Sequence, residues 1–441
     1  MAKGIYIHTF GCQMNVQDSE KMTFLMGAEG YEPVISPREA DLVILNTCSI
    51  RQKAVQKIMS RLGRLRDLKR RKPTMIIAVG GCLAQQWGKE FLEKADHLDI
   101  VFGTHNIHRL PEMVRKVREG GGRVSDISFH GSVPSLKIQA SPEEGKVGAY
   151  VTIMQGCDNF CTYCVVPLLR GPEESRPLDE ILAEIRCLAD RGIREVTLLG
   201  QNVNSYGRNL PGGASFARLL REIDDLGVME RVRFTTSHPR DLSDEVIGLF
   251  GRLRSLCEHI HLPVQSGSDA VLTMMNRGYT RDDYLRKVEK LRDVCPDIAV
   301  SSDMIVGFPG ETEKDFLQTL DLMEKIRFDN LFSFKYSERE GTVAVGLPGK
   351  VPEEEKARRL TILQGLQDRH ALERNRSWEG REVEVLVEGP SKGDPREMTG
   401  RTRGNKIVNF PGRGEMKGRL VKTRIVRAFL HSLRGEPVAE E

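Results

Sequence analysis

The sequence predicts an α/β chain in three parts: an N-terminal α/β domain with a parallel sheet, a partial (βα)6 barrel, and a small antiparallel β-barrel. Three observations predict this fold class. Short β-rich runs alternate with helical patterns in residues 1–135. A second alternation, of six strand and five helix patterns, fills residues 143–375. Short strands with Gly and Pro turns, and no helical periodicity, fill residues 376–438.

Composition limits the class of protein. A chain of 441 residues is too long for one ordinary core. No apolar run approaches the length of a membrane span, and the start "MAKGIYIHTFGC" lacks the apolar stretch of a secretory signal. We therefore expect a cytoplasmic protein with no membrane association. Nine cysteines are too few for a disulfide scaffold, so clustered cysteines predict metal or redox chemistry.

Positive charge is concentrated in two segments. Residues 51–72 carry ten Lys and Arg against one Asp, and residues 396–434 carry eleven against two Glu. The whole chain has a net charge of only +4. Such a distribution predicts a polyanionic partner. The alternative for each segment is an ordinary solvated helix or strand face.

In the N-terminal domain, three β-rich runs each lead to a cysteine. "GIYIHTFG" precedes Cys12, "ADLVILNTCS" contains Cys48, and "TMIIAVGGC" ends at Cys82. Parallel strands bring their C-terminal ends to one edge of a sheet, so we expect a joint metal-cluster site there. The alternative is that each cysteine is a buried core residue. An amphipathic helix after Cys48 is predicted by apolar residues at three- and four-residue steps: Ile50, Ala54, Ile58, Leu62 and Leu65.

Residues 120–146 are rich in Gly, Ser and Pro and predict a linker. The βα repeats that follow have short crossovers, as in a barrel whose functional face lies at the C-terminal ends of its strands. A charged helix is expected over residues 352–378. The last strands carry the second basic segment and predict an oligonucleotide-binding surface, or alternatively a docking module with an incidentally basic face.

Three cysteines lie close together in "GCDNFCTYC", on the loop after the first barrel strand: Cys157, Cys161 and Cys164. Thiolates at such spacings bind zinc or iron–sulfur clusters. A zinc site would need a further ligand, and the next cysteine, Cys187, occupies a predicted core position of a helix. Three cysteines leave one iron of a 4Fe–4S cluster without a protein ligand. A substrate or cofactor can bind at that iron.

The Cys-x3-Cys-x2-Cys spacing in this strand–loop context resembles the radical S-adenosylmethionine superfamily. This resemblance implies that S-adenosylmethionine binds the open iron and is cleaved to a 5′-deoxyadenosyl radical. Polar residues and Gly at the later strand ends then become candidate contacts to S-adenosylmethionine. The alternative for each is a loop cap or turn. The candidates are Gly200, Gln201, Asn202, Ser237, His261, Gln265 and Asp303.

Longer motifs extend the resemblance over essentially the whole chain. "NTCSIRQKAVQK", "GCDNFCTYCVVP", "HLPVQSGSDAVL" and "DMIVGFPGETEKDF" resemble the methylthiotransferase family of radical S-adenosylmethionine enzymes. The tail "VLVEGPSKGDPREMTGRTRGNKIVNFPG" resembles the RNA-binding TRAM domain of that family. Two departures from the family pattern are visible. Leu168–Leu169 replace an expected Tyr–Thr pair, and Glu340 replaces an expected proline.

The resemblance implies that Cys12, Cys48 and Cys82 ligate a second 4Fe–4S cluster, which holds or supplies sulfur. One S-adenosylmethionine would methylate that sulfur, and a second would yield the radical that abstracts hydrogen from C2 of the adenine. The implied reaction is methylthiolation of C2 of N6-isopentenyladenosine next to the anticodon of tRNA. The implied partners are the tRNA anticodon loop and an electron-donor protein, and we expect a monomer.

Two other functions are alternatives for this sequence. A related methylthiotransferase would act on threonylcarbamoyl adenosine or on a ribosomal protein, and "CSIRQKA" after Cys48 argues against it. A non-catalytic iron–sulfur RNA-binding protein would use its clusters as structure or sensor. Structural clusters are normally closed by four ligands, so two sets of three cysteines argue against that function.

Overall fold

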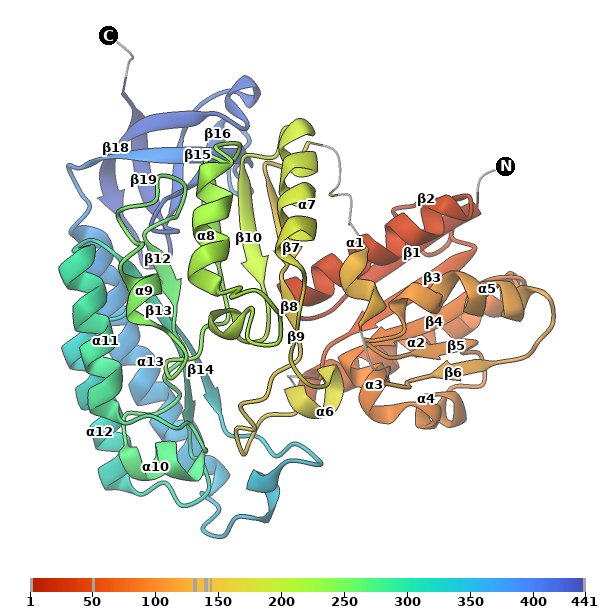
Figure 1. Cartoon of the computed structure of the whole chain (residues 1–441). Helices are drawn as coiled ribbons and strands as arrows, with labels where there is room; N and C mark the ends of the chain where they lie inside the picture. The colour runs from red at the N-terminus through yellow and green to blue at the C-terminus, as the bar shows by residue number, and fades with distance from the viewer. Residues whose placement is uncertain (1–2, 50–51, 130–132, 139–141, 143–144, 439–441) are drawn as a thin grey trace. The chain divides into compact units, whose positions relative to one another are not determined.

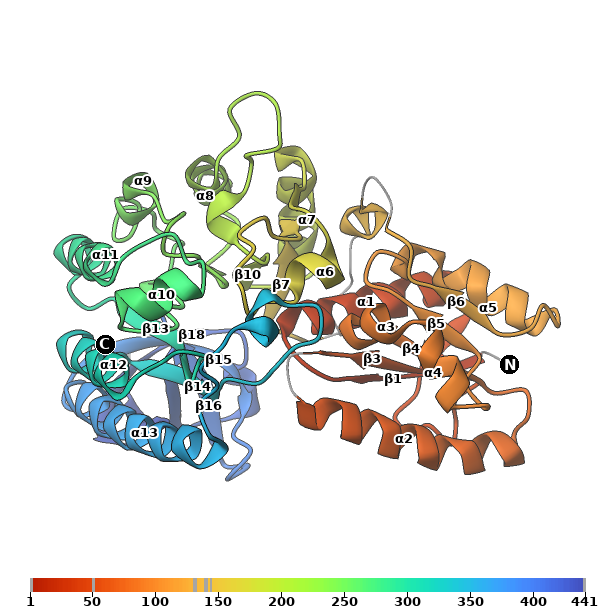
Figure 2. The same ribbon diagram turned by 90° about the horizontal axis from the view of Figure 1, so that it is seen from below.

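The computed structural model describes residues 3–438 except 50–51, 130–132, 139–141 and 143–144. The chain divides into two compact units (Figures 1 and 2). The first comprises residues 1–143, 152–158 and 165–176, and the second comprises residues 144–151, 159–164 and 177–441.

A parallel sheet of six strands forms the centre of the first unit, in the order β2-β1-β3-β4-β5-β6. Every residue of β3 and β4 is buried, as expected for central strands covered on both faces. The strands are β1 Lys3–Thr9, β2 Tyr31–Pro33, β3 Leu42–Thr47, β4 Ile76–Gly81, β5 Ile100–Phe102 and β6 Val124–Asp126.

Helices cover both faces of this sheet (Figure 2). On one face, Ile58, Leu62 and Leu65 of α2 lie in one core with β3 and β4 side chains. On the other face, Met22 and Met26 of α1 share a second core with side chains of α5. The helices are α1 Gln13–Ala28, α2 Gln52–Arg71, α3 Cys82–Trp87, α4 Lys89–Lys94 and α5 Leu110–Arg118. The predicted amphipathic helix is therefore confirmed over its described part; Ile50 and the side chain of Ala54 lie outside the described residues.

The predicted linker over residues 120–146 is wrong at residues 124–126. These residues form β6, the edge strand that pairs in parallel with β5. The amide of Val124 donates to the carbonyl of Asp99, which joins the strand to the sheet. A three-residue strand is too short to produce a detectable alternation, so the preceding glycines dominated the pattern. The later part of this segment includes residues 130–132, 139–141 and 143–144, which lie outside the described residues.

The second unit contains the partial barrel predicted from the βα repeats. Two three-stranded sheets have the orders β11-β10-β7 and β12-β13-β14, and the pairs β10–β11, β12–β13 and β13–β14 are parallel. The strands are β7 Gly148–Thr152, β10 Glu195–Leu199, β11 Arg231–Phe234, β12 His259–His261, β13 Ala299–Val306 and β14 Asn330–Lys335. The helices are α7 Leu178–Asp190, α8 Phe216–Asp225, α9 Asp244–Ile247, α10 Asp269–Met274, α11 Arg281–Val294, α12 Glu313–Ile326 and α13 Glu353–Arg376.

A closed five-stranded barrel follows, in the order β15-β16-β17-β19-β18. Its pairs are antiparallel except β17–β19, which are parallel. Its core includes Val385, Val408, Phe410 and Ile425, all buried. Closure leaves no free strand edge. The strands are β15 Glu382–Pro390, β16 Glu397–Thr402, β17 Ile407–Pro411, β18 Leu420–Ala428 and β19 Leu433–Pro437.

Candidate cluster and cofactor sites

The three separate cysteines of the first unit lie at the C-terminal ends of neighbouring strands. Cys12 is the N-cap residue of α1, just after β1. Cys48 follows β3 directly, and Cys82 is the first residue of α3 after β4. Because β1, β3 and β4 are adjacent in the sheet, the strand order places all three cysteines at one edge.

Gly11 allows the chain before Cys12 to approach Cys48 closely. It has a φ of +114°, and a Cβ there would lie 2.5 Å from Cys48 Cβ and 3.0 Å from Cys48 Sγ. Only glycine combines this backbone conformation with that separation. The local sequence "FGC" is thus required for the first two cysteines to share a site.

Arg170 is a buried cation beside Cys12 and Cys82. It belongs to the short helix α6 (Val166–Arg170), and its Nη2 donates to Asp18 Oδ2 at 2.8 Å and to Asn15 Oδ1 at 3.3 Å. Burial by itself would lower the pKa of Arg170, but Asp18, Cys82 and Cys12 raise that pKa above its usual value. Its Nη1 is buried and has no hydrogen-bond partner among the described residues. A buried donor without a partner next to two thiols fits an anionic group bound there.

The same cation acts on the Cys82 thiol. Burial raises the pKa of Cys82, and the Arg170 guanidinium opposes that rise. The thiolate, not the thiol, is the form that ligates a metal. Arg170 therefore favours the ligating form of Cys82.

Among the described residues, no group of three or more His, Cys, Asp or Glu side chains is arranged to hold a single metal ion. In a 4Fe–4S cluster each cysteine ligates a different iron, so its sulfurs are spaced more widely than those around one ion. The two cysteine sets therefore fit a cluster and not a mononuclear site.

The boundary between the two units falls within the three-cysteine loop, between Asp158 and Asn159. All three cysteines of this loop are partly exposed. On the first-unit side, the amide of Cys157 donates to the carbonyl of Gly171 at 3.2 Å. On the second-unit side, Thr162 Oγ1 donates to the carbonyl of Met274 at 2.8 Å. Hydrogen bonds thus hold both ends of the loop within their own units.

Arg277 supplies a buried cation beside Cys161. Its Nη1 lies 3.4 Å from Cys161 Sγ and 3.4 Å from the Tyr163 hydroxyl, and its Nη2 donates to the carbonyl of Pro263 at 2.7 Å. Burial would lower the pKa of Arg277, but Tyr163, Tyr279 and Cys161 raise it well above the usual value. A buried cation is costly unless anionic groups surround it, so Arg277 fits an anionic cluster held at this loop.

The predicted contacts for S-adenosylmethionine form two groups in the second unit. Gly200, Gln201 and Asn202 directly follow β10, and Ser237 lies shortly after β11. The loops after these two strands are joined, because the amide of Val203 donates to the carbonyl of Thr236 at 3.1 Å. Four buried polar atoms of this group have no hydrogen-bond partner among the described residues: Asn202 Oδ1, Asn204 Nδ2, Ser237 Oγ and His238 Nε2. Such atoms are costly unless a polar ligand satisfies them, so this group fits a polar cofactor.

His238 was not among the predicted contacts. The backbone amide of Arg240 donates to His238 Nδ1 at 3.2 Å, so the proton of the neutral ring is on Nε2. Burial, followed by the charge of Arg277, lowers the pKa of His238 to about 2. The residue is therefore a neutral donor whose N–H is free for a ligand.

Asp241, also absent from the predicted set, organises this group. Its carboxylate accepts from Asn202 Nδ2 at 2.7 Å and from Arg208 Nη2 at 2.6 Å. Burial raises the pKa of Asp241, but these hydrogen bonds outweigh burial and lower it below the usual value. Asp241 thereby fixes the side chain of Asn202, whose Oδ1 is the unpartnered atom.

The second group consists of His261, Gln265 and Asp303. His261 Nε2 lies 3.4 Å from Asp303 Oδ1, and its Nδ1 lies 3.0 Å from Ser301 Oγ. The amide of Gln265 donates to the carbonyl of Asp303 at 2.9 Å. Gln265 has a φ of +76° and Thr236 a φ of +68°, both in the left-handed region that is unfavourable for residues with a Cβ. Strained backbone of this kind clusters at ligand sites.

Two curated relatives match along the full length. The tRNA-2-methylthio-N(6)-dimethylallyladenosine synthase of Syntrophus aciditrophicus is 57% identical over 439 residues, covering 100% of this chain and 95% of the relative. The protein of the same name from Geobacter metallireducens is 53% identical over 436 residues, covering 98% of each. The chain belongs to the tRNA-2-methylthio-N6-dimethylallyladenosine synthase family.

Family models match successive parts of the chain. "Uncharacterized protein family UPF0004" matches residues 4–103, "Radical SAM superfamily" matches 151–323, and "TRAM domain" matches 376–438. The chain is therefore a radical S-adenosylmethionine enzyme, and its cofactors include S-adenosylmethionine and a 4Fe–4S cluster. This confirms the predicted fold class and enzyme family.

Solved structures share the fold at low sequence identity. The radical S-adenosylmethionine methyltransferase TsrM from Kitasatospora setae, with cobalamin and a [4Fe–4S] cluster bound, aligns with a TM-score of 0.56 at 15% identity. The alignment covers 76% of this chain and 72% of TsrM. The cobalamin-dependent enzyme OxsB aligns with a TM-score of 0.52 at 13% identity, over 83% of this chain and 56% of OxsB.

The cations of the basic tail fall into two groups. Arg403 pairs with Glu258 at 2.8 Å, and Lys406 pairs with Asp329 at 2.9 Å, so these cations dock the β-barrel on the rest of the second unit. Four exposed cations of the tail have no ion pair within the described part of the chain: Arg413, Lys417, Arg419 and Arg427. Arg403 and Lys406 thus contribute to docking, whereas RNA binding by the other four cations stays a prediction.

The remaining sequence features have ordinary surroundings. Leu168 is exposed and Leu169 is buried, so only Leu168 presents its side chain to solvent. Glu340 is exposed, and Cys187 is half-buried, not fully in the core as predicted. No helix among the described residues is long and apolar enough to cross a membrane.

Proposed function

We propose that this enzyme inserts a methylthio group at C2 of N6-isopentenyladenosine next to the anticodon of tRNA. The shared name of both full-length relatives describes this product. One structural observation carries the proposal: a second set of three cysteines, Cys12, Cys48 and Cys82, at one edge of the first-unit sheet. Cleavage of S-adenosylmethionine needs only one open cluster, so a second open set supports a sulfur-inserting role.

The first cluster is assigned to Cys157, Cys161 and Cys164. With S-adenosylmethionine bound, this group supplies an organic radical able to attack an unactivated aromatic C–H bond. Arg277 places a positive charge beside Cys161. The unpartnered atoms of Asn202, Asn204, Ser237 and His238 are suited to orient the polar parts of the cofactor. The other proposed contacts are Gly200, Gln201, His261, Gln265 and Asp303.

The second 4Fe–4S cluster is assigned to Cys12, Cys48 and Cys82. Arg170 neutralises charge there, and its unpartnered Nη1 is placed to donate to an anionic sulfur or sulfide. Asp18 and Asn15 hold the guanidinium in place. No acid–base residue is assigned, because hydrogen abstraction by a radical needs none.

The proposed domains are residues 1–135, 143–375 and 376–438, the last being the TRAM domain. The tRNA is the substrate that the family implies, and its anticodon loop is the proposed contact. A loop lets a base leave its stack more easily than a duplex does. An electron-donor protein, a monomeric state and a cytoplasmic location complete the proposal.

The test is anaerobic turnover with isopentenylated tRNA, followed by mass spectrometry of the nucleoside digest. We expect 2-methylthio-N6-isopentenyladenosine, and no product from tRNA that lacks the isopentenyl group. A parallel reaction with threonylcarbamoylated tRNA distinguishes the related activity. Thiolation of that nucleoside alone would replace the proposal, and S-adenosylmethionine cleavage without any thiolated nucleoside would contradict it.

A further inference from the structure

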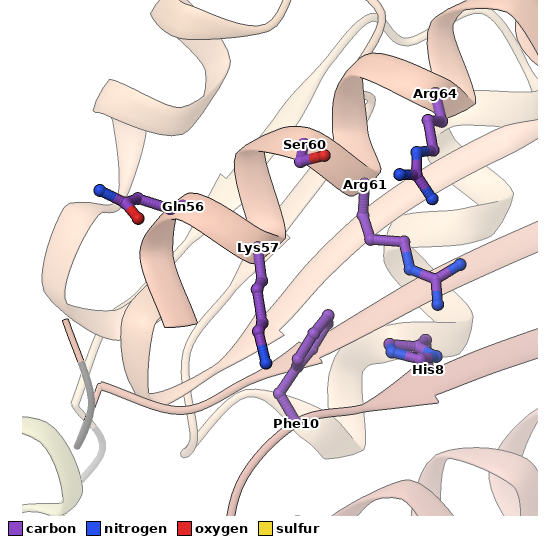
Figure 3. A pocket seen from close by; sticks show the side chains of 7 residues that line it. All are labelled: His8, Phe10, Gln56, Lys57, Ser60, Arg61 and Arg64. Atoms are coloured by element: carbon purple, nitrogen blue, oxygen red, sulfur yellow. The ribbon is translucent and has the colours of Figure 1, made fainter. Parts of the chain in front are cut away.

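A cavity of about 610 Å³ lies in the first unit between β1 and the first half of α2 (Figure 3). Its volume falls in the range of roughly 300–1,000 Å³ that is typical of small-molecule sites. Figure 3 shows Lys57, Arg61 and Arg64 projecting from α2 toward His8 of β1 and toward Phe10, which follows β1. The cavity contains none of the residues assigned above to a cluster or to S-adenosylmethionine.

Three cations line this cavity without an ion-pair partner among the described residues: Lys57, Arg61 and Arg64. They recur at steps of four and three residues, so they share one face of α2, where like charges repel and destabilise the helix. Two cations further along have ion-pair partners within the unit. Lys69 pairs with Asp99, and Lys72 pairs with Asp41 at 2.7 Å. The three cavity cations have no such counter-charge in the described part of the chain, as expected if it comes from a ligand.

The wall of the cavity opposite α2 is formed by two aromatic rings. The rings of Phe10 and His8 lie edge to face with centroids 4.5 Å apart, and both side chains are half-buried. Burial and the charge of Arg61 lower the pKa of His8, so near neutral pH it adds a polar ring but no further cation. A flat ring beside cations is the combination by which proteins hold a base together with its phosphate.

We propose that this cavity binds one nucleotide of the tRNA anticodon loop, with its phosphate at Lys57, Arg61 and Arg64 and its base against Phe10. The identity of the RNA rests on the proposed function. The cavity lies next to the second cysteine set in sequence, because Phe10 precedes Cys12 by two positions and α2 begins four positions after Cys48. A nucleotide held here would hold the loop beside those cysteines.

An acidic protein partner is the other class of polyanion. Such a partner would pair with the surface cations and would not need to contact the aromatic rings of the cavity. The aromatic contribution therefore separates the two classes, and the variants below are chosen to measure it apart from charge.

The test measures anisotropy of a fluorescein-labelled anticodon stem–loop RNA on anaerobically reconstituted holoenzyme, from 50 to 300 mM salt. The charge variant is Lys57→Gln/Arg61→Gln/Arg64→Gln. The matched control is Arg66→Gln/Arg70→Gln/Arg71→Gln, which removes the same charge from the same helix outside the cavity. We expect the first to lose roughly tenfold in affinity at 150 mM salt, and its log–log salt slope to fall by about 0.7, because one phosphate contact is lost. We expect the control to keep its slope.

Phe10→Leu measures the contribution of base stacking apart from charge, since leucine keeps an apolar side chain against the core. We expect about fivefold weaker binding with an unchanged salt slope. Thermal melts followed by circular dichroism show whether each variant is folded. Equal losses in the charge variant and its control, or full affinity of the charge variant, would overturn the proposal. So would full affinity of Phe10→Leu, and a charge variant defective only in reduction by a donor protein would indicate the acidic partner instead.

These outcomes are independent of the reaction itself. If the wild type binds the stem–loop through this cavity but yields no thiolated nucleoside, the proposed function fails and the binding site stands. If the charge variant binds normally and thiolates isopentenylated tRNA, the binding site fails and the proposed function stands.

Discussion

Buried arginines accompany both cysteine sets. Arg170 lies beside Cys12 and Cys82, and Arg277 lies 3.4 Å from Cys161 Sγ. Neighbouring groups fix each guanidinium in place: Asp18 pairs with Arg170, and the carbonyl of Pro263 accepts from Arg277. A buried cation is costly unless anions surround it, so these two positions predict anionic groups beyond the side chains themselves.

Replacing Arg170 by Gln should empty the second cluster site selectively. The change leaves Asp18 as a buried, unpaired carboxylate and removes the charge that favours the Cys82 thiolate; breaking such a pair costs about 3–5 kcal/mol. Two clusters hold about eight irons, so we expect about four per chain in the variant, with S-adenosylmethionine cleavage retained. Iron and sulfide analysis of the anaerobic protein measures this.

Arg194→Gln is the control, because Arg194 forms only an exposed pair with Glu230 at 3.8 Å. It should keep the full iron content. Full iron in Arg170→Gln as well would show that Arg170 has no part in holding the second cluster.

His238 predicts a stability that depends on pH. Its pKa is lowered to about 2 by burial and Arg277, against about 6.5 when unfolded, so the unfolded state binds the extra proton first. The contribution of neutral His238 to the free energy of unfolding is therefore fully present above about pH 6.5. It falls as the pH decreases from 6.5 toward 2. Between pH 6.5 and 5 the loss from this residue should be about 2 kcal/mol, visible as a lower Tm of the cluster-free protein.

His238→Asn should flatten this pH dependence, since Asn can still accept from the amide of Arg240 but cannot be protonated. The exposed His431 provides the matched control, His431→Asn. If His238→Asn and the wild type lose Tm in parallel below pH 6.5, the neutral state of His238 does not contribute to stability.

The cysteines could be predicted from the sequence, but the arginines and Asp241 could not. Cys157, Cys161 and Cys164 have a short spacing, and Cys12, Cys48 and Cys82 follow recognisable strands. Arg277 lies 116 positions beyond Cys161 and contacts it only through the tertiary fold. Asp241 and Arg170 likewise have no motif that distinguishes them from surface charges.

At the level of elements, strand ends position the chemistry. In the first unit, β1, β3 and β4 bring three cysteines to one edge. In the second, the loops after β10 and β11 bring Asn202 and Ser237 to the same group of unpartnered atoms. Long helices and strands were predicted well because their periodicity is strong. The short β6, α6 and β19 were not, because three to five residues carry too little pattern.

Strand β11 also fastens the C-terminal barrel. Arg233 donates to the carbonyls of Arg403 and Thr402 at 2.7 and 2.8 Å and to Glu195 Oε2 at 2.9 Å. Its neighbour Arg231 is fully buried and donates to the carbonyl of Arg401. The sequence "RVRF" predicts a strand, but two buried arginines in a barrel strand are understandable only once their partners on β16 are known.

Arg233→Met should loosen the C-terminal barrel, because it leaves two buried carbonyls and Glu195 without their donor. Removing one partner of a buried charged network costs about 3–5 kcal/mol. We expect faster limited proteolysis between α13 and β15. The exposed pair Arg221–Glu245, at 2.8 Å, provides the control Arg221→Met. An unchanged cleavage rate in Arg233→Met would show that this contact does not hold the barrel.

At the level of the whole molecule, the proposed function assigns tRNA binding and radical generation to different surfaces. The four unpaired tail cations, Arg413, Lys417, Arg419 and Arg427, are all exposed. Changing all four to Gln should weaken tRNA binding and lower its log–log salt slope by about 3, while S-adenosylmethionine cleavage without RNA stays unchanged. Anisotropy and 5′-deoxyadenosine release measure the two effects. Unchanged tRNA affinity would remove the tail from RNA recognition.

The central claim is that two open clusters divide the work, one for cleavage of S-adenosylmethionine and one for sulfur. The most direct test replaces Cys12, Cys48 and Cys82 together by Ala and quantifies 5′-deoxyadenosine and modified nucleosides in the same anaerobic reaction with isopentenylated tRNA. The claim predicts that 5′-deoxyadenosine is still formed while 2-methylthio-N6-isopentenyladenosine is absent. Methylthiolated product from this variant would contradict it.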